Sequence, residues 1–259
     1  MVLSLLAAAL APYHFTASTE TRSAYLSRSR ISEDRPVQVC EAAFSREAGP
    51  LGEFGIGYWA LTSITPRLAH VRRRLFSEED IGPFWKYSYD VAEGWTLANR
   101  ASLWWLLFGG YRDPDDGETQ YEVWNETSLK NPYVVPSVLV RRGWHSLDWV
   151  YVRTGLAKPF DLKPSLGVPL KVTPGIFTET GNQDFYCLRY GELPQGRSYH
   201  TAFLAVIGQV VVDWAISENW TAYAKLQEFG LVDRDARDQA SGIHRRELTI
   251  FTIGLEASF

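Results

Sequence analysis

Residues 247–259, ELTIFTIGLEASF, separate into two faces when they are read with a period of two. One face is apolar and carries Phe251, Ile253, Leu255, Ala257 and Phe259, and the other carries Thr252, Gly254, Glu256 and Ser258. Strict alternation predicts a β-strand with one apolar side and one wet side. The chain also stops on an aromatic residue, although final residues are usually polar and frayed. What the apolar side faces decides the fold.

The same alternation recurs along the chain between clusters of Gly, Pro, Asp and Asn. It predicts about twelve strands, near residues 17–29, 36–45, 53–65, 84–92, 95–110, 119–128, 133–141, 146–157, 166–175, 197–212, 218–228 and 246–259. An even number of strands is typical of bacterial transmembrane barrels.

The connectors between these strands fall into two kinds. Those that follow odd-numbered strands are mostly long and charged, such as RDPDDGE and LVDRDARDQASGIH. Those that follow even-numbered strands are mostly tight, such as AEG at 92–94 and LKNP at 129–132. Long loops at one rim and short turns at the other are typical of a transmembrane barrel, with the short turns in the periplasm.

Two arrangements of the apolar faces remain possible from the pattern. If they pack against one another, the chain is a soluble barrel or sandwich with a dry interior. If they face lipid, the charged faces line the interior, and the sheet must close because an open edge in lipid leaves backbone groups unpaired. The second arrangement also places aromatic residues near strand ends, where Trp and Tyr favour the membrane interface; these are Tyr25, Trp95, Trp220 and Phe259. We therefore predict an all-β, closed antiparallel transmembrane β-barrel. Residues 202–212, AFLAVIGQVVV, are apolar on both faces, so their inward and outward sides stay open.

Composition supports this class and excludes others. The formal net charge is −4, which gives no basis for binding the phosphate backbone of nucleic acid. Aromatic residues make up 14% of the chain, with ten Trp and thirteen Tyr against one Met, and such side chains suit a boundary between apolar and wet surroundings. Cys40 and Cys187 are too few for a zinc cluster, and the sequence does not decide whether they pair.

The start of the chain, MVLSLLAAALAPYHF, is an apolar run of signal-peptide length with an Ala-x-Ala step at residues 9–11. It lacks a basic residue ahead of the apolar run. We expect residues 1–16 to be an export signal or its remnant and residues 17–259 to form the barrel. A short helix or a truncated gene start is the alternative.

The terminal strand ending in Phe259 resembles the C-terminal signature of Gram-negative outer-membrane β-barrels. Residues 23–38, SAYLSRSRISEDRPVQ, and 119–140, TQYEVWNETSLKNPYVVPSVLV, are similar to uncharacterised barrels of the porin and MipA/OmpV type. The resemblance implies a location in the bacterial outer membrane, among its lipid and lipopolysaccharide. It also implies that the barrel assembly machinery reads the strand that ends in Phe259.

Charged residues on the wet faces are the candidates for a pore lining. They are Arg22, Lys86, Arg100, Glu122, Glu126 and Glu256. Glu122 and Glu126 lie about 13 Å apart along one strand face, which exceeds the usual spacing of paired glycosidase carboxylates. Such charges set the ion preference of a pore. We therefore expect a passive pore or channel for small solutes or ions, and no enzyme.

Two other functions stay open. A barrel whose lumen is closed by salt bridges would act as a scaffold for a periplasmic partner, as the resemblance to MipA-like proteins implies. A lipid hydrolase could use Ser198 and His200, which the pattern places on one face of one strand, although no GxSxG motif accompanies them.

Arginines in VRRRLFSEED at 71–80 could contact lipopolysaccharide phosphates, or the segment is a solvated loop tip. Residues 233–238, DRDARD, lack the glycine and distant glutamate of an EF-hand, and the chain carries no nucleotide-binding motif, so we expect no metal and no cofactor.

Overall fold

The computed structural model describes residues 13–27, 30–33, 36–64, 78–109, 120–144, 148–190, 193, 198–199, 203–240 and 247–259. The first barrel strand begins at Tyr13 rather than near residue 17. The apolar start of the chain, residues 1–12, lies outside the described residues, so the signal peptide stays a prediction. Most of the arginine-rich loop at 71–80 lies outside them as well.

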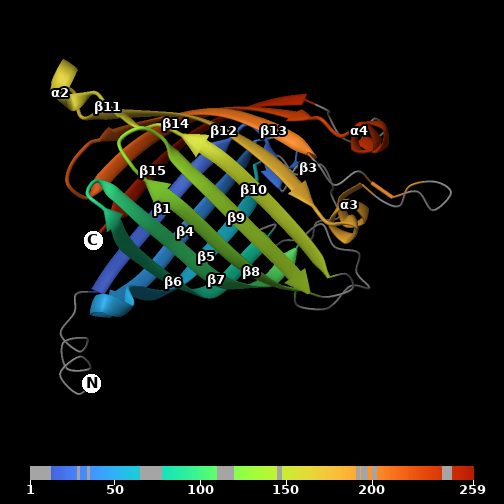
Figure 1. The fold of residues 1–259 in the computed structure, drawn as a ribbon, viewed down its shortest axis with the longest axis horizontal. Helices are drawn as coiled ribbons and strands as arrows, with labels where there is room; N and C mark the ends of the chain where they lie inside the picture. Colours follow the sequence, from blue (N-terminus) through green and yellow to red (C-terminus); the bar gives the residue numbers. More distant parts are fainter. Residues whose placement is uncertain are drawn as a thin grey trace.

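Twelve antiparallel strands form a closed ring (Figure 1). In chain order they are β1 (Tyr13–Arg22), β4 (Val37–Glu47), β5 (Glu53–Ser63), β6 (Glu78–Ala92), β7 (Trp95–Gly109), β8 (Gln120–Lys130), β9 (Val135–Trp144), β10 (Trp149–Ala157), β12 (Leu170–Gly181), β13 (Ala205–Ala215), β14 (Trp220–Leu231) and β15 (Glu247–Ser258). The ring closes where β1 pairs with β15, with Thr16 opposite Ser258. Closure leaves no unpaired sheet edge, which is the condition for strands to cross lipid.

The predicted strands correspond to these twelve, with shifts at their ends. The largest shift concerns the strand predicted at 197–212, because β13 begins only at Ala205. Three short strands stand apart from the ring: β2 (Tyr25–Ser27) and β3 (Arg30–Glu33) form a hairpin, and β11 (Phe160–Asp161) adds to β12. No helix among the described residues is long and apolar enough to span a membrane.

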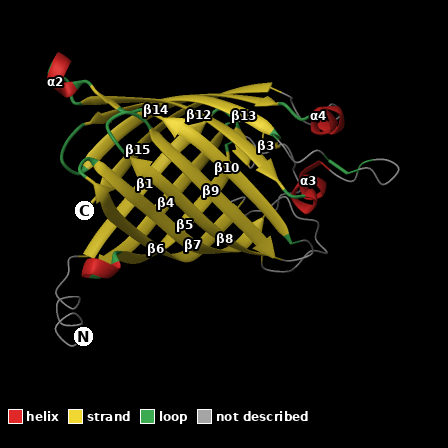
Figure 2. Cartoon of the chain, in the orientation of Figure 1, coloured by secondary structure: helices red, strands yellow, loops and turns green. Residues whose placement is uncertain are grey.

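The two rims of the barrel differ, as Figure 2 shows. One rim, which we call the short-turn rim, carries η1 (Gly49–Leu51), the turns at 93–94, 131–134 and 216–219, and the C-terminus. The opposite long-connector rim carries α3 (Gln183–Tyr190) and α4 (Arg234–Ala240). The connector 158–169 is an exception, because it lies on the short-turn rim but is long and contains β11 and α2 (Lys163–Leu166). Gly94, which has a φ of 74°, makes one of the tight turns possible.

The faces of the strands divide as the alternation predicted. In β15, Phe251 and Ile253 point outward and are 52% and 53% exposed, whereas Thr252 between them points into the barrel and is fully buried. In β7, Leu97, Leu103 and Trp105 take one face while Arg100 and Ser102 take the other, paired with inward residues of β6 and β8. The outer surface is therefore apolar and the inner surface is polar over most of the barrel.

One part of the interior is apolar instead. Phe185 and Tyr186 of α3 are fully buried against inward residues of β10 and neighbouring strands, and Tyr199 and Ala236 join them. We call this group the mouth cluster, since it lies at the long-connector rim; its strand members include Trp149, Tyr151, Ala205, Ile207, Phe229, Leu231 and Leu248. The cluster explains why residues 202–212 are apolar on both faces: β13 faces outward to the apolar exterior and inward to α3.

Candidate functional site

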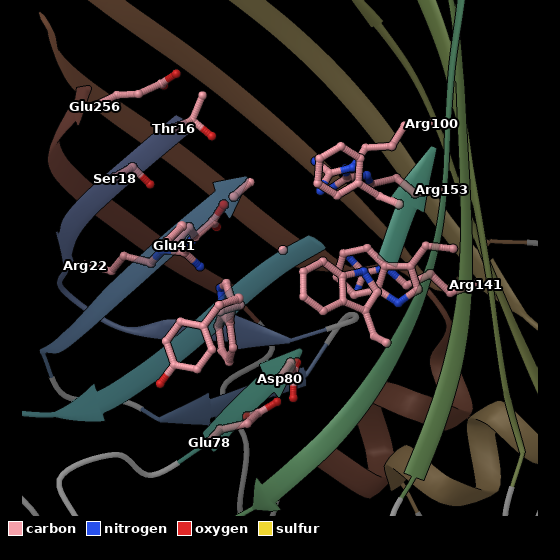
Figure 3. Close-up of a pocket in the computed structure, with 18 of the residues that line it drawn as sticks. Thr16, Ser18, Arg22, Glu41, Glu78, Asp80, Arg100, Arg141, Arg153 and Glu256 are labelled. Carbon is pink, nitrogen blue, oxygen red and sulfur yellow. The ribbon is translucent and has the colours of Figure 1, made fainter. Parts of the chain in front are cut away.

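The polar interior encloses a cavity of about 510 Å³, lined by residues of most barrel strands (Figure 3). Three arginines lie across the cavity from three carboxylates, while a fourth carboxylate, Glu179 of β12, is the register neighbour of one of the arginines. Arg100, Arg141 and Arg153 come from β7, β9 and β10. Glu41, Glu78 and Asp80 come from β4 and β6 and lie across the cavity from the arginines (Figure 3). A charged solute inside this cavity therefore meets side chains of both signs.

Other charges of the interior neutralise one another within the wall. Arg22 and Glu20 form an ion pair, and the Tyr223 hydroxyl donates a hydrogen bond to Glu20 at 2.7 Å. Lys86 Nζ lies 3.0 Å from Glu53 Oε1 on the neighbouring strand. The Lys86–Glu53 pair follows from the register, because antiparallel neighbours on one face come within reach of each other, whereas Arg22 and Glu20 share one face of β1. Both pairs stiffen the wall and contribute little net field to the lumen.

All six residues predicted as a pore lining face the interior. Arg22, Lys86, Arg100 and Glu256 line the cavity itself. Glu122 is 1% exposed and accepts a hydrogen bond from Trp124 Nε1 at 2.9 Å, so it lies within the wall beneath the cavity surface. Glu126 lies on the same face of β8 as Glu122, directly opposite Arg100.

The strand pattern placed Trp104 on the same face as Arg100, but the predicted lining left out other side chains of the cavity wall, among them Glu41, Glu78, Asp80, Trp124, Arg141 and Arg153. Arg153 follows an alternating pattern that could have revealed it, since Tyr151 and Arg153 share a face of β10. Arg141 is adjacent to Arg142, and two successive arginines hide which one points inward. Trp124 resembles a lipid-facing residue in type, so composition alone assigns it to the wrong side.

Ser198 of the proposed hydrolase pair does not lie on a strand. Ser198 is exposed in the connector between α3 and β13, so the prediction that it shares a strand face with His200 is wrong. His200 lies outside the described residues. Cys40 on β4 and Cys187 on α3 are both unpaired. Within the described ranges, no group of three or more His, Cys, Asp or Glu is arranged to hold a metal ion.

The apolar mouth cluster lies next to the polar cavity in the barrel interior. Burial raises the pKa of Tyr199 to about 12 and raises the pKa of Tyr186, both of which lie in the connector that carries α3. The Tyr199 backbone N–H donates to Gln183 Oε1 at 2.9 Å, which ties this connector to α3. The Tyr151 hydroxyl, at the boundary between the two regions, donates to Glu179.

A closed twelve-strand barrel with an apolar exterior and a charged lumen has the architecture of outer-membrane porins and channels. Among solved structures, the chain is similar to the COG4313 outer membrane channel from Pseudomonas putida F1, with a TM-score of 0.53, 10% identity and 96% of each chain covered. It is also similar to the NanC porin, with a TM-score of 0.50, 10% identity, and 94% of this chain and 98% of that chain covered. LpxR from Salmonella typhimurium matches with a TM-score of 0.47 at 10% identity, covering 93% of this chain and 99% of that chain. No protein-family model matches the sequence, and a search of curated proteins finds no match.

Proposed function

We propose that the protein is a passive channel for small solutes in the outer membrane of a Gram-negative bacterium, with the short-turn rim in the periplasm. The cavity of about 510 Å³ inside a closed barrel carries this proposal, because its walls are charged and its outer surface is apolar. A soluble barrel would show the reverse. The fold shared with the Pseudomonas putida channel supports the proposal.

Selectivity would come from the charges that line the cavity. The arginines of β7, β9 and β10 attract anions to one wall, and Glu41, Glu78 and Asp80 attract cations to the other. Rings and clusters of charge set ion preference in pores in this way. The mouth cluster fills one side of the lumen at the long-connector rim, so permeation is restricted to small solutes.

Single-channel recording in planar bilayers tests the proposal. Protein that shows the gel shift of a folded barrel on unheated samples is expected to give discrete conductance steps. The same protein heated before reconstitution is the matched control and is expected to give none. Folded protein that gives no steps at any voltage would overturn the channel.

A scaffold function is the second candidate, favoured by the connector 158–169. It is the long connector of the short-turn rim, and Phe160, Leu166 and Val168 are 45%, 63% and 41% exposed on it. An exposed apolar group on a projecting loop is typical of a protein contact. Replacing residues 159–168 with a short turn would abolish binding to a periplasmic partner and leave conductance unchanged. A shortened barrel that loses conductance would instead make this connector part of the channel.

Binding to lipopolysaccharide and recognition of the Phe259 strand by the assembly machinery belong to the same proposal. Phe259 is 57% exposed and packs edge-on against Trp220 at 6.1 Å, at the short-turn rim. An aromatic pair at this level suits the membrane interface. Absence of catalysis is also part of the proposal, and lack of lipid hydrolysis by the folded protein is the measurement that checks it.

A further inference from the structure

Each of the three cavity arginines lies over an aromatic ring. Arg141 lies over the ring of Trp124 at 3.5 Å, Arg100 over Phe84 at 5.0 Å, and Arg153 over Phe177 at 5.4 Å. We call Arg100, Arg141 and Arg153 the arginine wall. A guanidinium that stacks on a ring uses its face, which leaves the N–H donors on its edge for another group.

The strand register brings the arginine wall together. Arg100 pairs with Glu126, Glu126 with Leu139, and Leu139 with Arg153, so Arg100 and Arg153 lie in one row across four strands. At the usual strand spacing their Cα atoms are roughly 14 Å apart along the curved wall. Arg141 lies two residues beyond Leu139 on β9 and also lines the cavity.

Arg100 and Arg153 form no ion pair with a carboxylate within the described part of the chain. Arg22 and Lys86, which also line the cavity, do form such pairs. Burying unpaired arginine charge costs free energy unless water or a ligand compensates it. Arg100 and Arg153 are half-buried beside aromatic rings, and neither forms an ion pair with its register neighbour, Glu126 or Glu179. Their guanidinium groups can therefore receive an anion from the cavity.

Trp104 lines the same cavity and carries a buried N–H donor. Its side chain is 6% exposed, and its Nε1 has no hydrogen-bond partner among the described residues. The ring lies against Gly57, where an added Cβ would come within 2.9 Å of it, and a Cβ at Gly82 would collide with the backbone of β7. Glycine at these positions thus leaves space for β7 and for the Trp104 indole, whose N–H has no acceptor. The centroids of the Trp104 and Trp124 rings are 5.5 Å apart.

We propose that the arginine wall and Trp104 form a binding subsite for a small solute that carries a carboxylate or a phosphate. Planar oxyanions match the edge of a guanidinium through two parallel hydrogen bonds. The carboxylates of the opposite wall, Glu41, Glu78 and Asp80, would repel a second anionic group, so the preferred solute has its negative charge at one end and a neutral or cationic remainder. The inference names the solute class of the proposed channel and rests on that function.

The test compares two double variants of matched composition. Arg100→Gln with Arg153→Gln removes two charges from the arginine wall. Arg46→Gln with Arg142→Gln removes two arginines that lie outside the cavity, over Tyr13 and Trp144. Binding of benzoate, phenyl phosphate and benzylamine is measured by calorimetry on folded protein in detergent, and block of single-channel current by the same probes is measured in bilayers. Benzoate and phenyl phosphate separate the two oxyanions, and benzylamine is the cationic control.

We expect the wild type and the outer double variant to bind the preferred oxyanion equally, and the arginine-wall variant to bind it about tenfold or more weakly, since each charge-assisted hydrogen bond contributes at least that much. Equal affinity in both double variants, or wild-type binding of benzylamine as tight as binding of the oxyanions, would overturn the subsite. If the arginine-wall variant fails to fold, Arg153→Lys replaces it, because lysine keeps the charge but loses the bidentate pairing.

The outcomes separate the subsite from the channel. Calorimetric binding without conductance steps would refute the channel and leave the subsite standing. Conductance steps without oxyanion binding or block would refute the subsite and leave the channel standing.

Discussion

The mouth cluster and the cavity are two parts of one lumen with opposite physical chemistry. In the mouth cluster, Phe185 and Tyr186 are fully buried among aromatic and aliphatic side chains. In the cavity, arginines and carboxylates face an open volume of about 510 Å³. Both rest on inward faces of the same strands, since Tyr151 belongs to the cluster and Arg153, two residues along β10, belongs to the arginine wall.

The difference shows that strand alternation specifies a face but does not specify what fills it. Where α3 inserts over the inward face, apolar residues form an ordinary protein core, stabilised by burial. Where no helix covers that face, charged residues remain in contact with water and with one another. The long connectors therefore convert part of a hollow barrel into a packed one.

The largest expected effect comes from breaking the mouth cluster with Phe185→Ala. Phe185 is fully buried and its ring lies 5.3 Å from that of Tyr151 and 6.0 Å from that of Trp149. Truncation of a buried aromatic residue costs about 3–5 kcal/mol, so α3 should detach from the barrel while the strands stay folded. Faster proteolysis within α3 and a larger single-channel conductance are the measurements.

Phe203→Ala is the matched control, because Phe203 lies in the same connector and is 57% exposed. It should change neither the proteolysis rate nor the conductance. Detachment of α3 with no change in conductance would show that the mouth cluster does not restrict the pore.

A smaller effect is expected from Glu20→Gln in the paired part of the cavity wall. Glu20 is 6% exposed and holds Arg22 and the Tyr223 hydroxyl, so its loss leaves Arg22 without its ion-pair partner. We expect the free energy of unfolding to fall by about 1–3 kcal/mol, less than for a pair in a dry core because the lumen is wet. Urea unfolding in detergent, followed by the gel shift, measures it. Glu256→Gln changes an exposed residue of the same lumen and should leave the free energy of unfolding unchanged. An equal loss of stability in both variants would mean that the contacts of Glu20 contribute nothing specific.

The smallest effect concerns alkaline titration of the mouth cluster. Burial raises the pKa of Tyr199 to about 12, so the protonated phenol stabilises the folded state fully below the ordinary value, and this contribution disappears as the pH rises through about 12. Phenolate absorbance followed against pH should show that Tyr199→Phe removes a group that ionises near pH 12. A Tyr199 that titrates at the ordinary value of a tyrosine would place water inside the cluster.

Much of the fold could be predicted because each barrel strand repeats one local rule. Alternation in β15 placed Phe251 and Ile253 outward and Thr252 inward, and the structure confirms this. The closed antiparallel barrel and the sorting of connectors between rims were predicted from the same pattern and are confirmed. The pattern failed for residues 198–199 and 203–204, which lie before β13 and not on a strand.

The sequence by itself determined which residues face out and which face in, because the side-chain period of a strand is two and lipid accepts only one kind of face. It therefore also determined Arg100 and Glu256 as interior charges. Only the tertiary structure decided which interior charges are neutralised, which arginines stack on rings, and where a helix fills the lumen. Those properties depend on the register between strands that are distant in the chain, and on connectors whose course no local period controls.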